Sequence, residues 1–329
     1  MAQAPKSRQS GPRLTPEERA RLVEELDGDS PVPQPPKVRP LPPGTRPPAK
    51  PRAKAPSPPA ELAAATEAET APEAPRALPS PASASHDIAN DDPWLRLSEA
   101  KVDRRALERN LIITGARIDP AHTGFDVLRT RMVQTLADQR WRRVAVVSPT
   151  TGCGSSFTAL NLAVSLSRYH AISTFLLDMD LRTPTLARYM GLSRGKQAVD
   201  DVLQGRVPAG DWLARFGENR LQIGNRLAFG VNHRSNAYAA ELFQSPDTAA
   251  AIDEMLAQYL PEVVLYDLPP VLAHDDAIAF RDNFDCVLMV VGSGITRAAE
   301  VREAQRRLGE DKPLLGVILN KAEGDAFSA

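Results

Sequence analysis

The sequence predicts an α/β fold in which a mostly parallel β-sheet is flanked by helices on both faces. Between residues 143 and 320, short apolar runs alternate with helical patterns, as in sheets built from parallel strands and crossover helices. Polar and glycine-containing segments follow the apolar runs, at the sheet edge where open α/β folds bind ligands. A third observation is that 21 of the 30 prolines lie in residues 1–100, which predicts a long disordered amino-terminal region.

Residues 1–90 are therefore predicted to be a Pro-rich tail, with a short helix near residues 15–26. Thr15 opens a capping box that has proline at the first helical position, and Leu22 and Leu26 follow on one face. Two interpretations remain open. The segment is either a docking helix that folds in a partner groove or a transient helix in a tail.

The tail changes charge along its length. Residues 31–60 contain six Lys or Arg and no acidic residue, which predicts an extended basic segment, whereas residues 61–76 are acidic and rich in alanine. The basic segment is interpreted either as a solvated linker or as a contact for an anionic surface. The whole chain has a net charge of −1, and no nucleic-acid partner is expected.

Composition also indicates the compartment. The two cysteines, Cys153 and Cys286, make no disulfide framework and suit a reducing environment. The amino terminus lacks the apolar core of a signal peptide, and no run of 18 apolar residues is present. We therefore expect a cytoplasmic chain without a membrane span.

Residues 91–140 are predicted to form a helical lead-in that packs on the core. Asp92 can cap a helix that begins at Pro93, and residues 98–110 predict a charged helix. A further helix is predicted over residues 122–138, with an inner face formed by Phe125, Leu128, Met132 and Leu136.

The remaining domain, residues 141–323, is predicted to contain strands and helices in alternation. The expected strands are Val144–Val147, Thr174–Leu177, Leu221–Gly224, Val263–Tyr266, Cys286–Val291 and Leu314–Leu319. The expected helices are Ser156–Tyr169, Val199–Gln204, Trp212–Phe216, Ala237–Phe243, Pro246–Tyr259 and Arg297–Leu308.

Residues 144–158 have the pattern of a phosphate-binding loop, because an apolar strand, a short glycine-containing loop and an apolar helix follow one another. In such loops, backbone N–H groups and the helix amino terminus point at an anion. Against the pattern G-x-x-x-x-G-K-[ST], Gly154 and Ser156 match, Pro149 replaces the first glycine, and Ser155 stands at the lysine position. The alternative interpretation is an ordinary strand–helix turn.

The missing lysine normally reaches the β- and γ-phosphates of a nucleotide. The loss of one charge-assisted contact costs about 1.5–3 kcal/mol of binding free energy. A donor aimed at transition-state charge contributes about 10²–10³ to the rate. With Ser155 at this position, we expect nucleotide binding to survive in weakened form and phosphoryl transfer to be slow.

Three aspartates follow apolar runs. Asp178 and Asp180 lie on the same side of one strand end, since alternate residues share a face, and Asp267 follows another strand. Mg²⁺ prefers hard oxygen ligands and bridges carboxylates to phosphates. The sequence therefore predicts a magnesium site beside the glycine loop.

These motifs together resemble the bacterial tyrosine kinases of capsule and exopolysaccharide synthesis. That family belongs to the deviant P-loop NTPase group, which includes the MinD and ParA ATPases. The resemblance extends over residues 120–323 and is carried by three motifs in order, Ser148-Pro-x-x-Gly-x-Gly154, Leu177-Asp-x-Asp-x-Arg-x-Pro184 and Asp267-x-Pro-Pro270.

The resemblance implies ATP or ADP with Mg²⁺ as the cofactor, and it assigns roles to residues. Asp178 would help to activate the acceptor hydroxyl, and Arg182 would support the site. Asp180 would act in catalysis and would hold the metal together with Ser156 and Asp267. The nucleotide would contact Gly152, Cys153, Gly154, Ser155, Ser156 and Phe157, with Asn320 at the adenine.

A partner is also implied by the resemblance. Members of the family act beside a transmembrane polysaccharide chain-length regulator, or co-polymerase, or its cytoplasmic segment. We therefore expect peripheral association with the inner face of the cell membrane through that partner, together with homo-oligomerisation.

The chain departs from the family in three places, and all three concern the kinase cycle. Ser155 replaces the lysine. Of the oligomerisation motif E-x-x-R-x-x-R, which falls on Thr123, Asp126 and Arg129, only the last residue matches. The family usually ends in a tyrosine cluster, but the last tyrosine here is Tyr266.

Three functions remain open. The leading hypothesis is a nucleotide-binding regulator of polysaccharide export with weak or lost kinase activity, a pseudokinase. The second is an active tyrosine autokinase or ATPase in which Lys321 or Arg182 supplies the missing charge. The third is a positioning ATPase similar to MinD or ParA, which residues 149–151 disfavour because they lack the signature lysine of those proteins.

Overall fold

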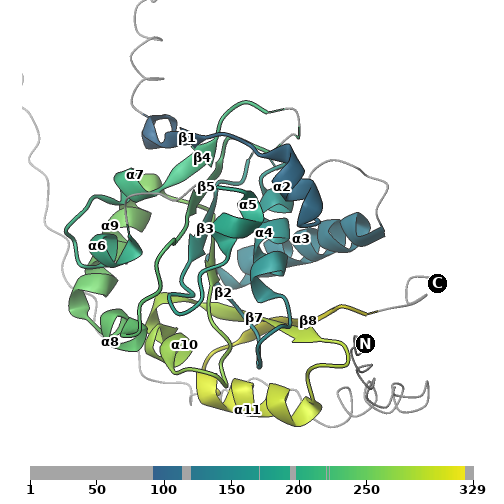
Figure 1. Ribbon diagram of the computed structural model, residues 1–329. Helices are drawn as coiled ribbons and strands as arrows, with labels where there is room; N and C mark the ends of the chain where they lie inside the picture. Colours follow the sequence, from purple (N-terminus) through teal and green to yellow (C-terminus); the bar gives the residue numbers. More distant parts are fainter. Residues whose placement is uncertain are drawn as a thin grey trace, which may run out of the picture.

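The computed structural model describes residues 92–112, 120–169, 171–192, 198–219, 221 and 223–322. The predicted tail, its helix near residues 15–26 and the residues after 322 lie outside this part of the chain. The fold class is the predicted one. Eight strands form one sheet in the order β1-β4-β5-β3-β6-β2-β7-β8, and every neighbouring pair is parallel except β4 and β5 (Figure 1).

The strands are short, and the central ones are apolar on both faces. β2, β3 and β6 are almost completely buried, because helices cover both sides of a parallel sheet. The strands are β1 Ser98–Ala100, β2 Arg143–Val147, β3 Thr174–Asp178, β4 Ala214–Phe216, β5 Leu227–Gly230, β6 Val263–Asp267, β7 Cys286–Gly292 and β8 Leu314–Asn320.

Helices cover the sheet in two layers (Figure 1). One layer contains α2 Arg104–Arg109, α3 Pro120–Gln139, α4 Ser155–Leu166 and α5 Leu186–Met190. The other contains α6 Val199–Leu203, α7 Ala209–Trp212, α8 Ala239–Phe243, α9 Pro246–Tyr259, α10 Asp276–Ala279 and α11 Ala298–Leu308. Two 3-10 helices, η1 Pro93–Arg96 and η2 Arg281–Asn283, complete the described elements.

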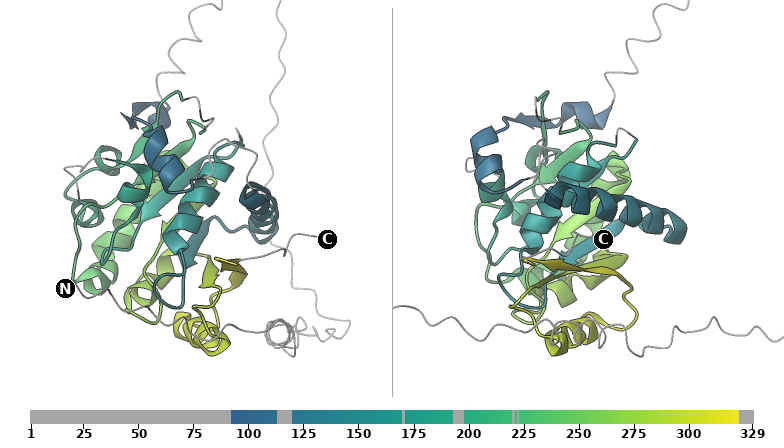
Figure 2. Two further views of the ribbon diagram at one scale, coloured as in Figure 1. Left: turned by 45° about the vertical axis from the view of Figure 1, so that its right-hand side comes forward. Right: turned by 90° about the vertical axis from the view of Figure 1, so that its right-hand side faces the viewer.

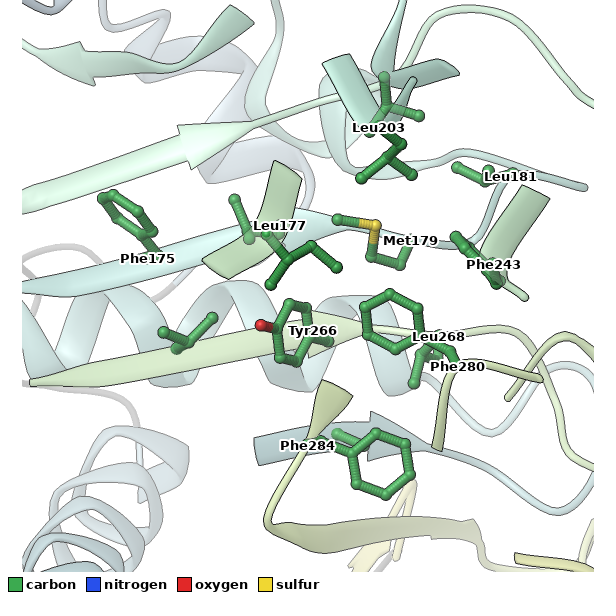
Figure 3. Close-up of a cluster of buried hydrophobic side chains, with 14 of the residues drawn as sticks. Phe175, Leu177, Met179, Leu181, Leu203, Phe243, Tyr266, Leu268, Phe280 and Phe284 are labelled. Atoms are coloured by element: carbon green, nitrogen blue, oxygen red, sulfur yellow. The ribbon is translucent and has the colours of Figure 1, made fainter. Parts of the chain in front are cut away.

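Each layer encloses its own hydrophobic core. Under α4 the core is mostly aliphatic, with Phe216 and Phe229 as its buried aromatic residues, and Met132 and Leu136 of α3 contribute to it, as the sequence predicts. On the opposite face the core is rich in aromatic side chains, and Figure 3 shows Tyr266 beside Phe280 and Leu177. The two cores fix the strands from both sides, so the strand ends that carry polar residues are held in place.

Three sequence-based expectations are wrong. Residues 212–216 are not a helix, because α7 ends at Trp212 and β4 follows. The described residues of the predicted strand Leu221–Gly224, which are 221, 223 and 224, are not in a strand, and β5 begins at Leu227. Residues 98–110 form β1 followed by α2, since β1 pairs with β4, a long-range contact that local pattern does not reveal.

The two edges of the sheet differ. β1 has three residues, whereas β8 has seven and exposes Val317 and Leu319 on its surface. Figure 2 shows β8 at the rim of the domain above α11. None of the described helices combines the length and hydrophobicity that a bilayer crossing requires.

Candidate functional site

The glycine loop connects β2 to α4 at the carboxyl edge of the sheet. Gly152 and Gly154 have φ angles of +82° and +93°, a left-handed conformation that glycine adopts at low cost. A Cβ on Gly154 would lie 2.3 Å from the Asn320 side-chain nitrogen, so a larger residue would also displace that side chain. The two left-handed glycines stand just before α4, a backbone conformation that is compatible with a phosphate cradle.

Hydrogen bonds that involve several side chains hold this loop in place. The Ser148 hydroxyl donates to the Thr150 carbonyl at 2.9 Å, and the fully buried Cys153 thiol lies 3.2 Å from both that carbonyl and the Thr296 hydroxyl. The Asn320 amide donates to the Cys153 carbonyl at 2.8 Å. Cys153 thus contributes backbone to the loop while its thiol points into the protein.

Asn320 is expected from the family resemblance to touch adenine. In the structure its side chain is already engaged, because its oxygen accepts from the Lys321 N–H at 2.9 Å while its nitrogen holds the loop. The residue lies at the end of β8, beside the predicted site. Its observed role is to join β8 to the glycine loop.

The first turn of α4 carries Ser155, Ser156 and Phe157. Ser155 is the first helical residue, and no side chain caps this helix start. Phe157 turns toward α3, where its ring lies 6.4 Å from that of Phe125. The free N–H groups of this turn and the Ser156 hydroxyl are therefore the parts of α4 available to an anion and its metal.

Asp178 and Asp267 are paired neighbours at the ends of β3 and β6, and both are fully buried. Within the described structure, Asp178 accepts one long hydrogen bond, 3.4 Å from the Asn232 N–H to Oδ2, and its Oδ1 has no partner. Neither oxygen of Asp267 has a hydrogen-bond partner there. Buried oxygens without donors are rare and indicate a missing ligand, ion or proton.

The electrostatics of the pair follow from this burial. Desolvation raises the pKa of Asp267 to about 8, with the nearby Ser156 hydroxyl lowering it and Asp180 adding repulsion. Desolvation also raises the pKa of Asp178 well above its usual range, and the charges of Asp267 and Asp180 add to the rise. Two carboxyl groups so close to each other tend to hold protons unless a cation is present.

Asp180 has a different environment. Its oxygens accept from the Thr183 N–H at 2.9 Å and from the Thr183 hydroxyl at 3.0 Å, so it shapes the loop after β3. It is 7% exposed and lies close enough to raise the pKa of both Asp178 and Asp267. Its carboxylate belongs to the same acidic cluster and remains able to contribute to a metal site.

Arg182 forms an ion pair away from the glycine loop. Its guanidinium donates two 2.9 Å hydrogen bonds to the fully buried Asp276 of α10, and it also donates to the Ala237 carbonyl. Sequence reasoning missed Asp276, which lies nine residues beyond Asp267 in a segment without a motif. Arg182 therefore ties the loop that carries Asp180 to α10.

The acidic cluster fits Mg²⁺. Three buried carboxylate oxygens of Asp178 and Asp267 lack partners, and Ser156 lies next to Asp267. Among the described residues, no set of three acidic, His or Cys side chains chelates a metal alone. In nucleotide sites, Mg²⁺ is usually held by one or two carboxylates together with phosphates and waters.

No protein-family profile matches the chain, but individual proteins do. "Putative tyrosine-protein kinase EpsB" of Ralstonia nicotianae is 29% identical over 210 residues, which is 64% of this chain and 27% of EpsB. Tyrosine-protein kinase YwqD of Bacillus subtilis is 27% identical over 215 residues, which is 65% of this chain and 86% of YwqD. The chain thus matches about a quarter of the length of EpsB.

Solved structures give the same result. The kinase domain of VpsO aligns with a TM-score of 0.53 at 26% identity, over 62% of this chain and 97% of that domain. The chain is therefore similar in sequence to bacterial tyrosine-protein kinases and shares their fold, as the resemblance predicts.

Proposed function

We propose that this chain, whose relatives are bacterial tyrosine-protein kinases, is a nucleotide-binding regulator of exopolysaccharide or capsule biosynthesis and export with weak or lost kinase activity. One observation carries the proposal. The glycine loop and the buried carboxylates are kept, while the first residue of α4 is Ser155, a short neutral side chain.

The proposed ligand is ATP or ADP with Mg²⁺. The loop at Gly152 and Gly154 and the amino terminus of α4 would cradle the phosphates. Ser156, Asp180 and Asp267 would hold the metal, which supplies positive charge between the carboxylates and the phosphate oxygens. Asp178 lies opposite Asp267 and would face the acceptor.

Cations that could replace the lysine are few. The described loop between β2 and α4 carries no Lys or Arg. Arg182 is held by Asp276, and leaving that partner would strand a fully buried carboxylate. Phosphoryl transfer relies on positive charge at the transferred group, so we expect it to be slow.

The rival function is an active autokinase, and one observation favours it. Lys321 directly follows Asn320, whose amide contacts the glycine loop, and its side chain is exposed. Lys321 could swing toward the phosphates, with the 70% exposed Tyr238 as an acceptor. Under this alternative, Lys321→Ala would abolish turnover.

A partner and a location belong to the same proposal. We place the chain in the cytoplasm, at the inner face of the cell membrane, beside a transmembrane chain-length regulator. Copurification of full-length chain with membranes only when the regulator is present would support this. Equal recovery in membranes that lack the regulator would contradict it.

The function is tested by calorimetric titration of the full chain with ADP–Mg²⁺ and ATP–Mg²⁺, together with phosphate release. We expect Ser155→Lys to tighten ATP binding about tenfold or more, since one restored charged contact contributes about 1.5–3 kcal/mol. Gln305→Lys, on the exposed surface of α11, adds the same charge away from the site and serves as the control.

Two results would overturn the proposal. Rapid turnover by the wild type with no gain in Ser155→Lys would mean that another residue supplies the charge and that the chain is an active enzyme. No nucleotide binding by either protein would mean that the loop is only a strand–helix connection.

A further inference from the structure

A concave surface lies at the amino-terminal edge of the sheet, opposite the glycine loop. It is a hollow of about 280 Å³ lined mainly by Arg140, Arg142, Arg143, Leu256 and Leu260, and we call it the arginine hollow. Arg143 is paired with Asp285. Within the described residues, the exposed guanidiniums of Arg140 and Arg142 have no partner.

The backbone at this hollow is unusual. Arg140 and Leu260 directly follow α3 and α9 and have φ angles of +58° and +46°. A left-handed residue after a helix is usually glycine, and a larger residue there costs about 1–2 kcal/mol. Two such residues point their side chains at the same hollow, and Leu260 is 67% exposed. Conformational cost at a surface site indicates a role for these side chains.

The chain enters the described structure beside this hollow. The Trp94 indole donates to the Tyr259 carbonyl at 2.8 Å, one residue before Leu260. Trp94, near the first described residue, therefore lies next to the arginine hollow. A segment ending at residue 75 is separated from Asp92 by 16 residues, which span up to about 50 Å when extended.

The charge pattern of that preceding chain selects one segment. Residues 61–75 contain four glutamates and no Lys or Arg, together with Leu62. Residues 31–60 contain six Lys or Arg and no acidic residue, so the arginine hollow would repel them. The acidic segment is thus the complementary one and also the nearer one.

We propose that residues 61–75 of this chain dock in the arginine hollow, with glutamates against Arg140 and Arg142 and apolar side chains against Leu256 and Leu260. Because the segment is tethered, its effective concentration is on the order of millimolar, so contacts that are individually weak suffice. The inference does not depend on the proposed function.

The test uses a nitroxide label on the full chain at Thr66→Cys. Cys153 and Cys286 are both buried, so the label reacts at the engineered position. At low salt, amide signals of residues 140–142 and 256–260 should broaden, and they should recover at high salt because the contacts are ionic. Arg140→Glu with Arg142→Glu should abolish the broadening, and adding Glu67→Arg with Glu69→Arg should restore it.

The control is Arg131→Glu with Arg302→Glu, which changes the net charge equally on exposed positions of α3 and α11. It should leave the broadening unchanged. Broadening elsewhere on the domain, or none at low salt, overturns the proposal. A mixture of labelled and isotope-enriched unlabelled chains separates the sources, since broadening in the mixture would mean that the tail of a second copy occupies the hollow.

Discussion

Two aspartates at opposite edges of the sheet differ in their hydrogen-bond donors and in the direction of their pKa shifts. Asp285, at the amino-terminal edge, accepts from the N–H groups of Arg142 and Arg143 at 2.8 and 2.9 Å and from the Arg143 guanidinium. Partial burial raises its pKa, but these donors outweigh burial and the net pKa is lowered. Among the described residues, Asp267 at the carboxyl edge has no hydrogen-bond donor within bonding distance, although the Ser156 hydroxyl lies near it, and its pKa is raised to about 8.

The difference separates a carboxylate whose compensating donors lie in the fold from one that we propose contacts a bound metal. Asp285 stabilises the domain because its compensating charges are built into the fold. Asp276 is a third case, since it is fully buried at the same edge as Asp267 and carries its own cation, Arg182. The buried carboxylates at the carboxyl edge are therefore not all equivalent, because Asp276 is neutralised by an arginine of the same fold. Arg182 neutralises Asp276, whereas the described loop between β2 and α4 itself carries no Lys or Arg.

The largest expected effect is a gain in stability. Asp267→Asn should raise the free energy of unfolding at pH 8, by at most about 5 kcal/mol for a pKa raised by about four units. In the wild type, the folded state keeps a proton between about pH 4 and pH 8 that the unfolded state has lost, so stability falls as pH rises through that window. Urea unfolding at pH 5 and pH 8 without Mg²⁺ measures this.

The stability change measured for Asp267→Asn also depends on Asp178, because the pKa of Asp178 is raised as well and the two groups interact. Asp178→Asn and the double variant therefore accompany it. A loss of stability in Asp267→Asn at pH 8 would mean that Asp267 has a donor in solution and that the two sheet edges do not differ as described.

The second largest expected effect is a loss of stability. Arg182→Met should lower the free energy of unfolding by about 3–5 kcal/mol, because it leaves Asp276 buried without a cation. Arg182→Met with Asp276→Leu should recover much of the loss. The measurement is thermal or urea unfolding of the three proteins, and a change below about 1 kcal/mol in the single variant would show that Asp276 is solvated.

The smallest of the three effects belongs to the other edge. Asp285→Ala should lower the free energy of unfolding by about 2 kcal/mol at pH 7, since two strand N–H groups and Arg143 lose their acceptor. The pKa of Asp285 is lowered, so its contribution is present above about pH 4 and disappears as pH falls through the native pKa. Equal loss at pH 2 and pH 7 would contradict this.

The parallel core was accessible to sequence reasoning because strands buried on both faces are continuous apolar runs. β2, β3, β6, β7 and β8 begin within one residue of their predicted starts. The errors fall at the edge of the sheet. Leu221-Gln-Ile-Gly224 and Leu227-Ala-Phe-Gly230 have almost the same local pattern, and only the second can pair with β3 and bury every residue.

Prediction of the site from the sequence is limited in the same way. Sequence spacing brings Asp178 and Asp267 to one edge, and the structure pairs them in register. Sequence spacing does not reveal that Arg182 pairs with Asp276 or that the Asn320 amide donates to the Cys153 carbonyl. Those contacts depend on where α10 and β8 come to lie, which is decided by packing between segments distant in the chain.

The strand order has a consequence for how the chain is made. β2 lies between β6 and β7, so Val144 pairs with Leu265, which follows it by 121 residues, and with Cys286. At about 5–20 residues per second, roughly 6–25 s of synthesis separate β2 from its first neighbour. During that interval one of the most apolar strands of the protein has both edges open. The nascent chain must therefore shield β2 with α4 or rely on a chaperone until the carboxyl half emerges.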